Sequence, residues 1–259
     1  MADGNHQLLT ITHQQPNMIL KDISLDSPEA NILLDEALFV SAEKFSGGEV
    51  LRFWESPKPF VVLGRIGKAG EDVNAAAVRK DNIPVLRRTS GGGTVVQGPG
   101  CLNYTLVLDK DRDPAVNDLR RSYQWISDRI IDALSRQGIE AVFRPISDIA
   151  LASGEKKFSG NAQRRGKQFI LHHGTVLYDF DLRLISKYLQ MPKDIPEYRR
   201  ERKHDDFVAN IPVNPQLFKQ ALAESFSARA SDPVLTVKER ELIVSLGEKG
   251  MISVDLDLS

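Results

Sequence analysis

The chain has 259 residues, with 34 Lys and Arg against 35 Asp and Glu, and 41% of its residues are hydrophobic. This length and composition predict one large globular domain, or one domain with a small appendage. The near balance of charge gives no global field that would attract nucleic acid or an anionic membrane, so neither is expected as a main partner. No apolar run approaches the roughly 18 residues of a membrane-spanning helix.

The expected compartment follows from the N-terminal residues and from cysteine usage. Residues 1–17 are polar and contain neither an apolar core nor an arginine, which argues against a secretory signal and a transit peptide. Cys101 is the only cysteine and has no partner for a disulfide within the chain. Because free thiols persist in a reducing compartment, we expect a cytoplasmic protein.

In the first half of the chain, predicted strands come in groups separated by helices. Residues 19–23 are expected to form a strand, and Asp26 or Ser27 to cap a helix. The apolar face of that helix consists of Ile32, Leu33, Ala37 and Leu38. Further strands are expected at residues 50–54, 60–63, 84–87, 94–96 and 102–108, with a short helix at 73–80.

The second half predicts one long helix over about 114–137, ended by Gly138, with Trp125, Ile126, Ile130 and Leu134 on one face. Strands follow at 141–143, 149–151, 157–163 and 168–178, then helices at about 181–189, 215–228 and 237–246. Helices do not follow every strand, so the pattern predicts an α+β fold with a central mixed, largely antiparallel sheet flanked by helices. We place the main domain at residues 1–211, with its core from about residue 18, and expect 212–259 to form a short helical extension.

A glycine loop lies between two apolar runs, with three consecutive glycines from Gly91 to Gly93. Glycines let backbone N–H groups approach a phosphate closely. Arg88 precedes them, and Ser90 and Thr94 supply hydroxyl groups; arginine suits phosphate because its planar fork binds two oxygens. A strand follows the loop, so it is neither a P-loop nor a dinucleotide fingerprint. Composition alone leaves phosphate binding and a tight hairpin with solvated arginines about equally open.

Two segments after the glycine loop are also informative. Residues 156–163 read Lys-Lys-Phe-Ser-Gly-Asn-Ala-Gln, and residues 172–175 read His-His-Gly-Thr. Each segment alone would be interpreted as ordinary strand residues. Preceded by Gly64-Arg65 and by the Arg-Arg-Thr-Ser-Gly-Gly-Gly of residues 87–93, they resemble the lipoate–protein ligase family, within the biotin/lipoate ligase and octanoyltransferase superfamily. The resemblance covers about residues 31–210 and implies a biotin/lipoate ligase-like catalytic domain.

The resemblance implies a two-step reaction. ATP would convert lipoate, or octanoate, to the acyl-adenylate with release of pyrophosphate, and the acyl group would pass to a lysine of a lipoyl carrier domain. Such carriers are the E2 subunits of 2-oxoacid dehydrogenases and the H protein of glycine cleavage. A carboxylate attacking a phosphate brings two anions together, so positive charge must lie between them. Lys157 matches the lysine with this role in the family; it would hold both anions and not act as the nucleophile.

The family motif also assigns the neighbouring residues. ATP and the adenylate would be bound by Lys157 together with Arg88, Ser90, Gly91, Gly92, Gly93, Thr94, Val95, Val96 and Asp148. The lipoyl group would be bound by Trp54, Arg65, Gly92, Lys157 and His173, with Trp54 as an apolar wall because the acyl tail carries no charge. Mg²⁺ is implied because pyrophosphate leaves, and Asp148 matches an acidic residue near that metal.

Some positions depart from the family pattern and leave alternatives open. Ser147 stands where an Asn is usual, Gly67 where a Gln is common, Gln97 for a His and Cys101 for an Asn. An octanoyltransferase would move an acyl group without ATP through a cysteine nucleophile. Cys101 lies in the glycine-loop hairpin and not in the later loop where those enzymes carry their nucleophile, so the ligase is favoured. A non-catalytic lipoyl-binding protein is a third interpretation, against which Arg88, Lys157 and the full glycine loop argue.

Residues 212–259 are too few for the large C-terminal accessory domain that many ligases carry. The resemblance therefore implies a protein that works alone or with a separate accessory subunit. The charged segment 198–206 fits either a solvated helix face or a docking patch for acidic carrier domains, with Arg199 and Arg202 as its test positions.

Overall fold

The computed structural model describes residues 18–45, 47–192, 195–230, 234–249, 252 and 254, so the N-terminal residues 1–17 that argued against a signal peptide lie outside the described part. An eight-stranded sheet dominates the fold, with strand order β11-β1-β2-β6-β10-β9-β8-β7. Its strands pair antiparallel except for β1, which is parallel to both β2 and β11. The predicted α+β class with a mixed, largely antiparallel sheet is confirmed. In the part of the chain that is described, no helix has the length and apolar character to cross a membrane.

The strands of the large sheet are β1 Ile19–Asp22, β2 Val50–Trp54, β6 Cys101–Asp109, β7 Ala141–Arg144, β8 Asp148–Leu151, β9 Lys157–Arg165, β10 Phe169–Leu177 and β11 Arg229–Ala230. The central strands β6 and β10 pair along their whole length, from Cys101 opposite Leu177 to Asp109 opposite Phe169. Side chains alternate between the faces, so Tyr104 and Leu106 enter one core and Val107 enters another. This pair of long strands gives the site a rigid base.

A second, three-stranded sheet has the order β4-β3-β5 and carries the glycine loop. Its strands are β3 Phe60–Leu63, β4 Val85–Arg87 and β5 Val95–Gln97, and the loop connects β4 to β5. Two short helices, α2 Ala69–Asp72 and α3 Ala75–Lys80, lie between β3 and β4. The helix predicted from residue 73 begins two residues later because the Asn74 side chain accepts from the backbone N–H of Ala77 at 3.3 Å and caps it.

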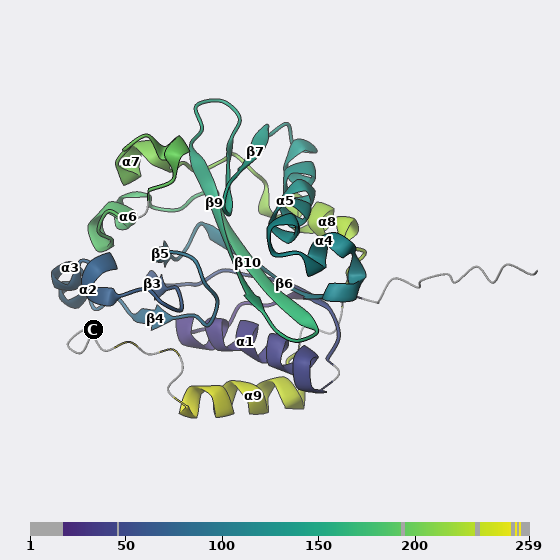
Figure 1. Ribbon diagram of the computed structural model, residues 1–259. Helices are drawn as coiled ribbons and strands as arrows, with labels where there is room; N and C mark the ends of the chain where they lie inside the picture. The colour runs from purple at the N-terminus through teal and green to yellow at the C-terminus, as the bar shows by residue number, and fades with distance from the viewer. Residues whose placement is uncertain are drawn as a thin grey trace, which may run out of the picture.

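Helices cover both faces of the large sheet (Figure 1). Helix α1 Pro28–Phe45 packs against β6 and β10 and is covered by α9 Val237–Glu248, while α5 Leu119–Ser135 and α8 Pro215–Ser225 lie on the other face. The start of α1 agrees with the predicted cap, since Ser27 Oγ accepts from the backbone N–H of Ala30 at 3.1 Å. Helix α9 begins with a capping box between Thr236 and Glu239.

The single helix predicted over 114–137 is wrong, because the structure has two helices there. Helix α4 Pro114–Asn117 ends at Asp118, whose backbone is extended, and α5 begins directly after it. The Asp118 carboxylate accepts from the N–H of Arg121 at 2.7 Å, so it caps a new helix instead of continuing the old one. Gly138, with φ +73°, follows the end of α5 as predicted.

The remaining short helices are η1 Lys110–Arg112, α6 Arg183–Tyr188, the 3₁₀ helix η2 Glu197–Arg199 and α7 His204–Phe207. Residues beyond 211 pack onto the rest of the chain. Phe218, Leu222 and Phe226 are buried in the core between the sheet and α5. The backbone oxygen of Ile252 accepts from the N–H of Arg87 at 2.7 Å and thereby lies beside the entry to the glycine loop.

Candidate functional site

The glycine loop, residues 88–94, is folded around the side chain of Arg88. The Nε of Arg88 donates to Ser90 Oγ at 3.0 Å, and Nη2 donates to the carbonyl oxygens of Gly91 at 2.7 Å and Gly93 at 2.8 Å. Burial lowers the pKa of Arg88 to about 10, so the guanidinium stays charged at neutral pH. The loop therefore carries a fixed positive charge directly behind its glycine backbone.

The glycines have two different structural roles. A Cβ at Gly64 would lie 2.0 Å from the carbonyl oxygen of Gly92, and Gly92 itself has φ +81°. The N–H of Gly91 donates to the carbonyl oxygen of Gln163 on β9 at 3.3 Å, so the loop lies along that strand. A Cβ at Gly91 or Gly93 would meet no described atom within 4 Å. Gly64 and Gly92 thus allow close packing, whereas Gly91 and Gly93 face open space that a ligand can enter.

His173 joins the loop to the central sheet. It lies on β10 between Thr105 and Ala162 of the neighbouring strands. Its Nε2 lies 2.6 Å from Ser90 Oγ. Burial holds the pKa of His173 well below its usual value, and the nearby Arg88 guanidinium lowers it further. His173 is therefore neutral at physiological pH and acts as a hydrogen-bonding wall, not as a cation.

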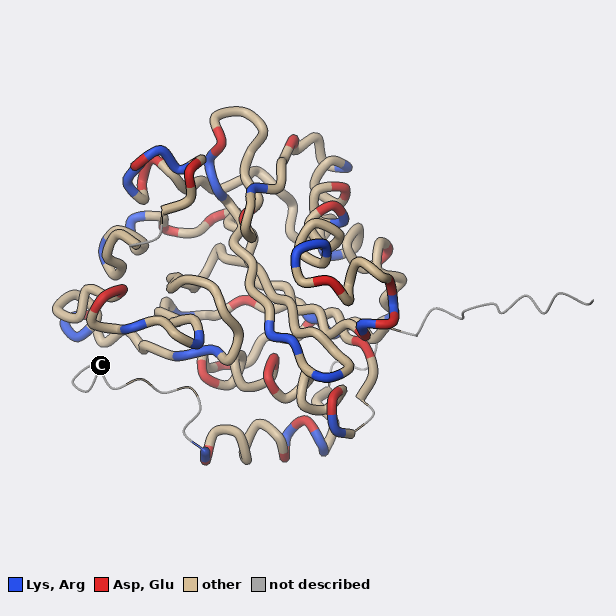
Figure 2. The backbone as a smooth tube through the Cα atoms, viewed as in Figure 1, with Lys and Arg blue, Asp and Glu red and all other residues tan. Residues whose placement is uncertain are grey.

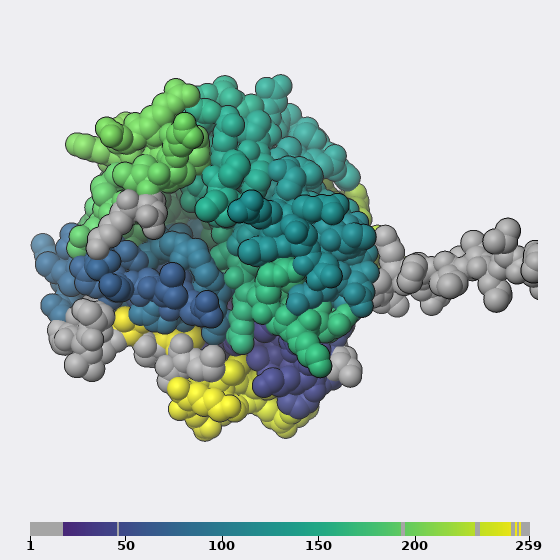
Figure 3. All heavy atoms as spheres, in the orientation of Figure 1, coloured from purple at the N-terminus to yellow at the C-terminus, as the bar shows by residue number. Residues whose placement is uncertain are grey.

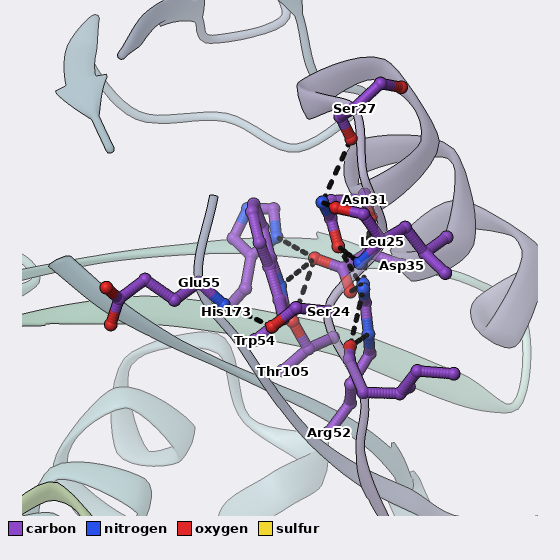
Figure 4. A network of polar contacts seen from close by, with 11 residues as sticks. Ser24, Leu25, Ser27, Asn31, Asp35, Arg52, Trp54, Glu55, Thr105 and His173 are labelled. Atoms are coloured by element: carbon purple, nitrogen blue, oxygen red, sulfur yellow. Dashed lines mark hydrogen bonds and ion pairs between the residues drawn. The ribbon is translucent and has the colours of Figure 1, made fainter. Parts of the chain in front are cut away.

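Asp35 on α1 is the centre of a buried polar network (Figure 4). One carboxylate oxygen accepts from Arg52 Nη1 at 2.6 Å, and the other accepts from Thr105 Oγ1 at 2.9 Å and Trp54 Nε1 at 3.2 Å. His173 Nδ1 lies 4.0 Å from the second oxygen. Burial raises the pKa of Asp35 and the Arg52 charge opposes this rise. The network fixes the orientation of the Trp54 indole and places it beside His173.

Glu36, the next residue of α1, ties the glycine loop to β9. It accepts a hydrogen bond from Thr89 Oγ1 and forms an ion pair with Arg164. Asp35 and Glu36 were missed as functional residues in the sequence. A signal for them exists, because two adjacent carboxylates interrupt the apolar run of residues 32–40, and acidic residues that become buried are rare unless paired.

A cavity of about 10 Å³ lies between α1, the glycine loop and β10. Its lining consists of Ile32, Leu33, Asp35, Glu36, Arg88, Thr89, Leu171, His173 and Ile252. This space is roughly that of one water molecule, and the lining supplies charged and polar partners for it.

Lys157 stands at the start of β9, and its ammonium forms an ion pair with Asp148 at the start of β8. The Nζ to Oδ1 distance is 2.7 Å. The lysine side chain lies over Gly160, where a Cβ would come within 3.0 Å of Nζ. The other oxygen of Asp148 accepts from the hydroxyl of Tyr198 at 2.6 Å. Tyr198 was missed in the sequence because no local pattern connects residues 50 positions apart.

The other predicted nucleotide residues lie on the outer side of the loop. Thr94 Oγ1 donates to Asp72 Oδ2 at 2.6 Å, so its hydroxyl is already engaged within the protein. Val95 and Val96 belong to β5, and their side chains pack into the apolar clusters around the small sheet. The side chain of Arg65 is exposed, while its N–H donates to the carbonyl oxygen of Ser90 at 2.9 Å.

The structure therefore gathers most of the predicted residues around one strand, β9. Ser90, His173 and the three loop glycines form one group beside β9, and Lys157 with Asp148 forms a second group at the start of the same strand. Trp54 lies on β2 and is connected to His173 through Asp35. Arg65 and Thr94 are peripheral to both groups.

Asp148 was expected near a metal ion. Among the residues that the structure describes, no group of three or more His, Cys, Asp or Glu is placed to hold one. The two oxygens of Asp148 are occupied by Lys157 and Tyr198. Mg²⁺ at nucleotide sites is commonly held by one or two carboxylates together with substrate phosphates. The residues present thus fit an ion that arrives on the phosphates, with Asp148 as a single protein ligand.

Cys101 has the environment of a small apolar residue. Its side chain is buried at the start of β6, and its N–H donates to the carbonyl oxygen of Gly98 at 3.1 Å. Burial and the nearby Glu55 carboxylate raise the pKa of the thiol to about 12. A thiolate does not form at this position at neutral pH.

The charged segment 198–206 lies in the helices η2 and α7 and the turn between them, and Figure 2 shows basic and acidic residues close together along it. Its basic side chains differ in exposure. Arg199 is buried, and its guanidinium lies 4.6 Å from the ring centroid of Phe207. Arg202 donates to the carbonyl oxygen of Gly154 at 3.2 Å, which fixes the segment beside the β8–β9 hairpin, as Figure 3 shows. Arg200 and Lys203 are exposed. Arg199 and Arg202 thus stabilise the segment. The exposed side chains that a partner can reach are Lys203 and Arg200, of which Arg200 also forms an ion pair with Glu155 at 3.2 Å.

The fold and this arrangement of loop, lysine and histidine define a member of the lipoyl protein ligase A/B catalytic domain family, whose model matches residues 27–248. Two relatives show the range of the family. A probable lipoate-protein ligase A from Mycoplasma pneumoniae is 32% identical over 166 residues, which are 64% of this chain and 47% of that protein. An octanoyltransferase LipM from Kyrpidia tusciae is 26% identical over 249 residues, covering 85% of this chain and 90% of that protein.

Solved structures agree with the family assignment. A chain from an archaeal lipoylation system, described as a bipartite lipoate protein ligase and its E2 lipoyl domain from Thermoplasma acidophilum, superposes with a TM-score of 0.76 at 25% identity over 90% of this chain and 92% of that one. A lipoate-protein ligase A bound with ATP gives 0.75 at 25% identity over 90% and 95%. By contrast, the chain spans about half the length of the Mycoplasma relatives that it matches.

Proposed function

We propose that the protein is an ATP-dependent lipoate–protein ligase, which adenylates lipoate or octanoate and transfers the acyl group to a lysine of a lipoyl carrier domain. The observation that carries the proposal is the position of the Lys157 ammonium. Lys157 belongs to β9, the strand along which the glycine loop lies, and its Nζ lies 2.7 Å from Oδ1 of Asp148. A reaction between a carboxylate and a phosphate needs a cation that reduces the repulsion between the two anions. The Lys157 ammonium supplies that charge near the glycine loop. The similarity to a ligase bound with ATP supports the same nucleotide here.

In the first step, an oxygen of the acid's carboxylate attacks the α-phosphorus of ATP, and the bond to pyrophosphate breaks. Lys157 exchanges Asp148 for the two reacting anions and holds them together. Arg88 keeps its positive charge behind the loop, whose Gly91 and Gly93 backbone lies against the phosphates. Asp148 would be the protein residue that helps to hold Mg²⁺ brought in with the phosphates, and the ion would neutralise charge on the pyrophosphate. In the second step, the carrier amine attacks the acyl carbonyl and AMP leaves.

The acyl tail is proposed to lie between Trp54 and His173. Asp35 fixes the indole through its Nε1–H, and the neutral imidazole has no charge that an apolar chain would have to desolvate. Chain-length preference then depends on how far these two side chains and the α1 face allow the tail to enter.

A transferase without ATP is the second candidate, favoured by the similarity to an octanoyltransferase over most of the chain. Such a reaction through a cysteine requires a reactive thiol. Cys101 is the only cysteine in the sequence, and burial raises the pKa of its thiol to about 12. This chemistry supports the ligase over the transferase.

The proposed partners are lipoyl carrier domains of 2-oxoacid dehydrogenase E2 subunits and the glycine cleavage H protein. The bipartite neighbour supports a separate accessory subunit that assists adenylation. The free thiol of Cys101 fits a reducing compartment, and we propose the cytoplasm as the place of action.

One assay separates the candidates. The purified chain is incubated with lipoate, ATP and Mg²⁺, with and without a carrier domain, and acyl-adenylate and carrier mass are followed by mass spectrometry. The ligase predicts adenylate from ATP and unchanged activity in Cys101→Ser. Carrier modification only from an octanoyl thioester, abolished by Cys101→Ser, would establish the transferase instead. Binding of lipoate with neither product would identify a lipoyl-binding protein.

A further inference from the structure

Tyr198 makes a contact that extends the Lys157 site by one residue. Its hydroxyl donates to Oδ2 of Asp148 at 2.6 Å, and Oδ1 of the same carboxylate holds Lys157 Nζ at 2.7 Å. The three side chains come from η2, β8 and β9, which are separate parts of the sequence. Asp148 is thus held by two donors at once, one on each oxygen.

The Tyr198 side chain is itself held in a fixed orientation. Its ring centroid lies 5.3 Å from that of Phe207, and its carbonyl oxygen accepts from Arg202 Nη2 at 2.8 Å. The phenol hydroxyl is a hydrogen-bond donor, and in this orientation it donates to Asp148.

The segment that carries Tyr198 also holds the backbone of Lys157. The N–H of Ala209 donates to the carbonyl oxygen of Lys157 at 2.9 Å, and Val208 forms a parallel bridge with the same residue. One stretch of chain, residues 198–209, therefore fixes Lys157 both at its backbone and, through Asp148, at its ammonium.

We propose that Tyr198 is a positioning residue for adenylation, an inference that rests on the proposed function. A positioning residue is needed because Lys157 exchanges partners during the reaction. When Lys157 moves from Asp148 to the substrate anions, a carboxylate that is only 8% exposed loses its cation. A buried charge without partners is unfavourable, so Asp148 would otherwise follow the lysine and compete with the substrate. The Tyr198 hydroxyl holds Oδ2 and keeps Asp148 in place during the exchange, which leaves Oδ1 for the Mg²⁺ of the proposed function.

The test compares two tyrosines that each donate to an aspartate. Tyr188 donates to Asp81 at 2.9 Å, away from Lys157, and serves as the matched control. Tyr198→Phe is expected to lower kcat for adenylate formation about tenfold with KM for ATP and lipoate changed less than about twofold, since the lost hydrogen bond acts on the exchange step. Tyr188→Phe is expected to change neither. Equal losses of kcat in both variants would overturn the inference.

A second readout distinguishes action through Asp148 from a general structural effect. In the Asp148→Asn background Lys157 has no carboxylate to leave, so Tyr198→Phe is expected to have no further effect on kcat. Additive losses in the double variant would contradict the proposed role, because independent sites add and coupled sites do not.

A measurement that needs no turnover keeps the two proposals separable. Lysines are labelled with ¹³C at Cε, and the Lys157 resonance is assigned by its loss in Lys157→Met. Tyr198→Phe is expected to shift or broaden this resonance, and Tyr188→Phe to leave it unchanged. An unmoved resonance in Tyr198→Phe overturns the positioning role. A moved resonance in a chain that forms no adenylate supports the positioning of Lys157 and rejects the proposed function alone.

Discussion

The hydroxyl of Ser90 lies 2.6 Å from Nε2 of His173 and joins the glycine loop to β10. Because Arg88 Nε donates to the same hydroxyl oxygen at 3.0 Å, the serine proton is available for the neutral imidazole. A single hydroxyl therefore links the charged side chain behind the loop to the wall proposed for the acyl chain.

Removing this hydroxyl tests the link. Ser90→Ala is expected to lower kcat/KM for adenylation about 10- to 100-fold, equivalent to about 1.4–2.8 kcal/mol of transition-state stabilisation, because the loop loses both contacts. Ser127 is the matched control: it is equally buried, on α5, and its Oγ has no hydrogen-bond partner among the described residues. Steady-state assays measure kcat/KM for both variants. A Ser90→Ala enzyme as active as Ser127→Ala would contradict a role for the Ser90–His173 contact in adenylation.

The two strand histidines predict how stability depends on pH. Burial lowers the pKa of His172 to about 3 and holds that of His173 well below 6.5, so the unfolded chain binds more protons than the folded one below about pH 6.5. Their contribution to the free energy of unfolding is complete above that pH and falls by about 1.4 kcal/mol per pH unit for each histidine as the pH decreases. Urea unfolding at pH 7.5, 6.5 and 5.5 measures this slope.

The same series on His172→Gln separates the histidines from other groups. The variant loses some stability at every pH, but its slope between pH 6.5 and 5.5 is expected to be smaller by about one histidine's share. A slope equal to that of the wild type would show that His172 does not cause the decline.

The open space at the loop predicts a variant that folds but does not bind nucleotide. Gly93→Ala is expected to keep the wild-type Tm, since its Cβ meets no described atom within 4 Å, yet to raise KM for ATP at least about tenfold because the methyl group occupies the phosphate position. Gly64→Ala is the contrast, because its Cβ would lie 2.0 Å from the oxygen of Gly92 and lower Tm as well. Unchanged ATP dependence in Gly93→Ala would place the phosphates elsewhere.

Exposed and inward-facing basic residues of the 198–206 segment are expected to differ in the effect of mutation. Charge reversal at the exposed Arg200 and Lys203 is expected to raise the apparent KM for an acidic carrier domain severalfold and to leave adenylation unchanged. Arg202→Glu is expected to lower Tm, since this arginine donates to the backbone of the β8–β9 hairpin. Transfer kinetics with a purified carrier domain measure the first effect; an unaltered KM in the double reversal would remove this surface from carrier binding.

Much of the fold was predictable because it follows from local patterns. The paired apolar strands, the helix beginning near Ser27 and the stop at Gly138 each depend on residues close in sequence. The break at Asp118 was not predicted, because a helical period continues across it and only the side-chain cap decides where α5 begins.

The site was predictable to the extent that its motifs are contiguous. The glycine loop, Lys157 and His173 are read from short segments whose order resembles a family. Asp35, Glu36 and Tyr198 were not found, because their roles depend on partners 17 to 128 residues away in the sequence. The contacts of Arg199 and Arg202 with the Phe207 ring were likewise not predicted. A run of charged residues is normally expected to be solvated, and its packing against an aromatic ring depends on the tertiary structure.

The role proposed for Lys157, as the cation between carboxylate and phosphate, carries the proposed function. Its most direct test is the amount of acyl-adenylate formed in a single turnover with lipoate, ATP and Mg²⁺, measured by mass spectrometry for the wild type and for Lys157→Met, with any accessory subunit supplied equally to both. We expect adenylate with the wild type and at least about a thousandfold slower formation with the variant, since the charge that joins the anions is lost. Near-normal adenylate formation by Lys157→Met would contradict it.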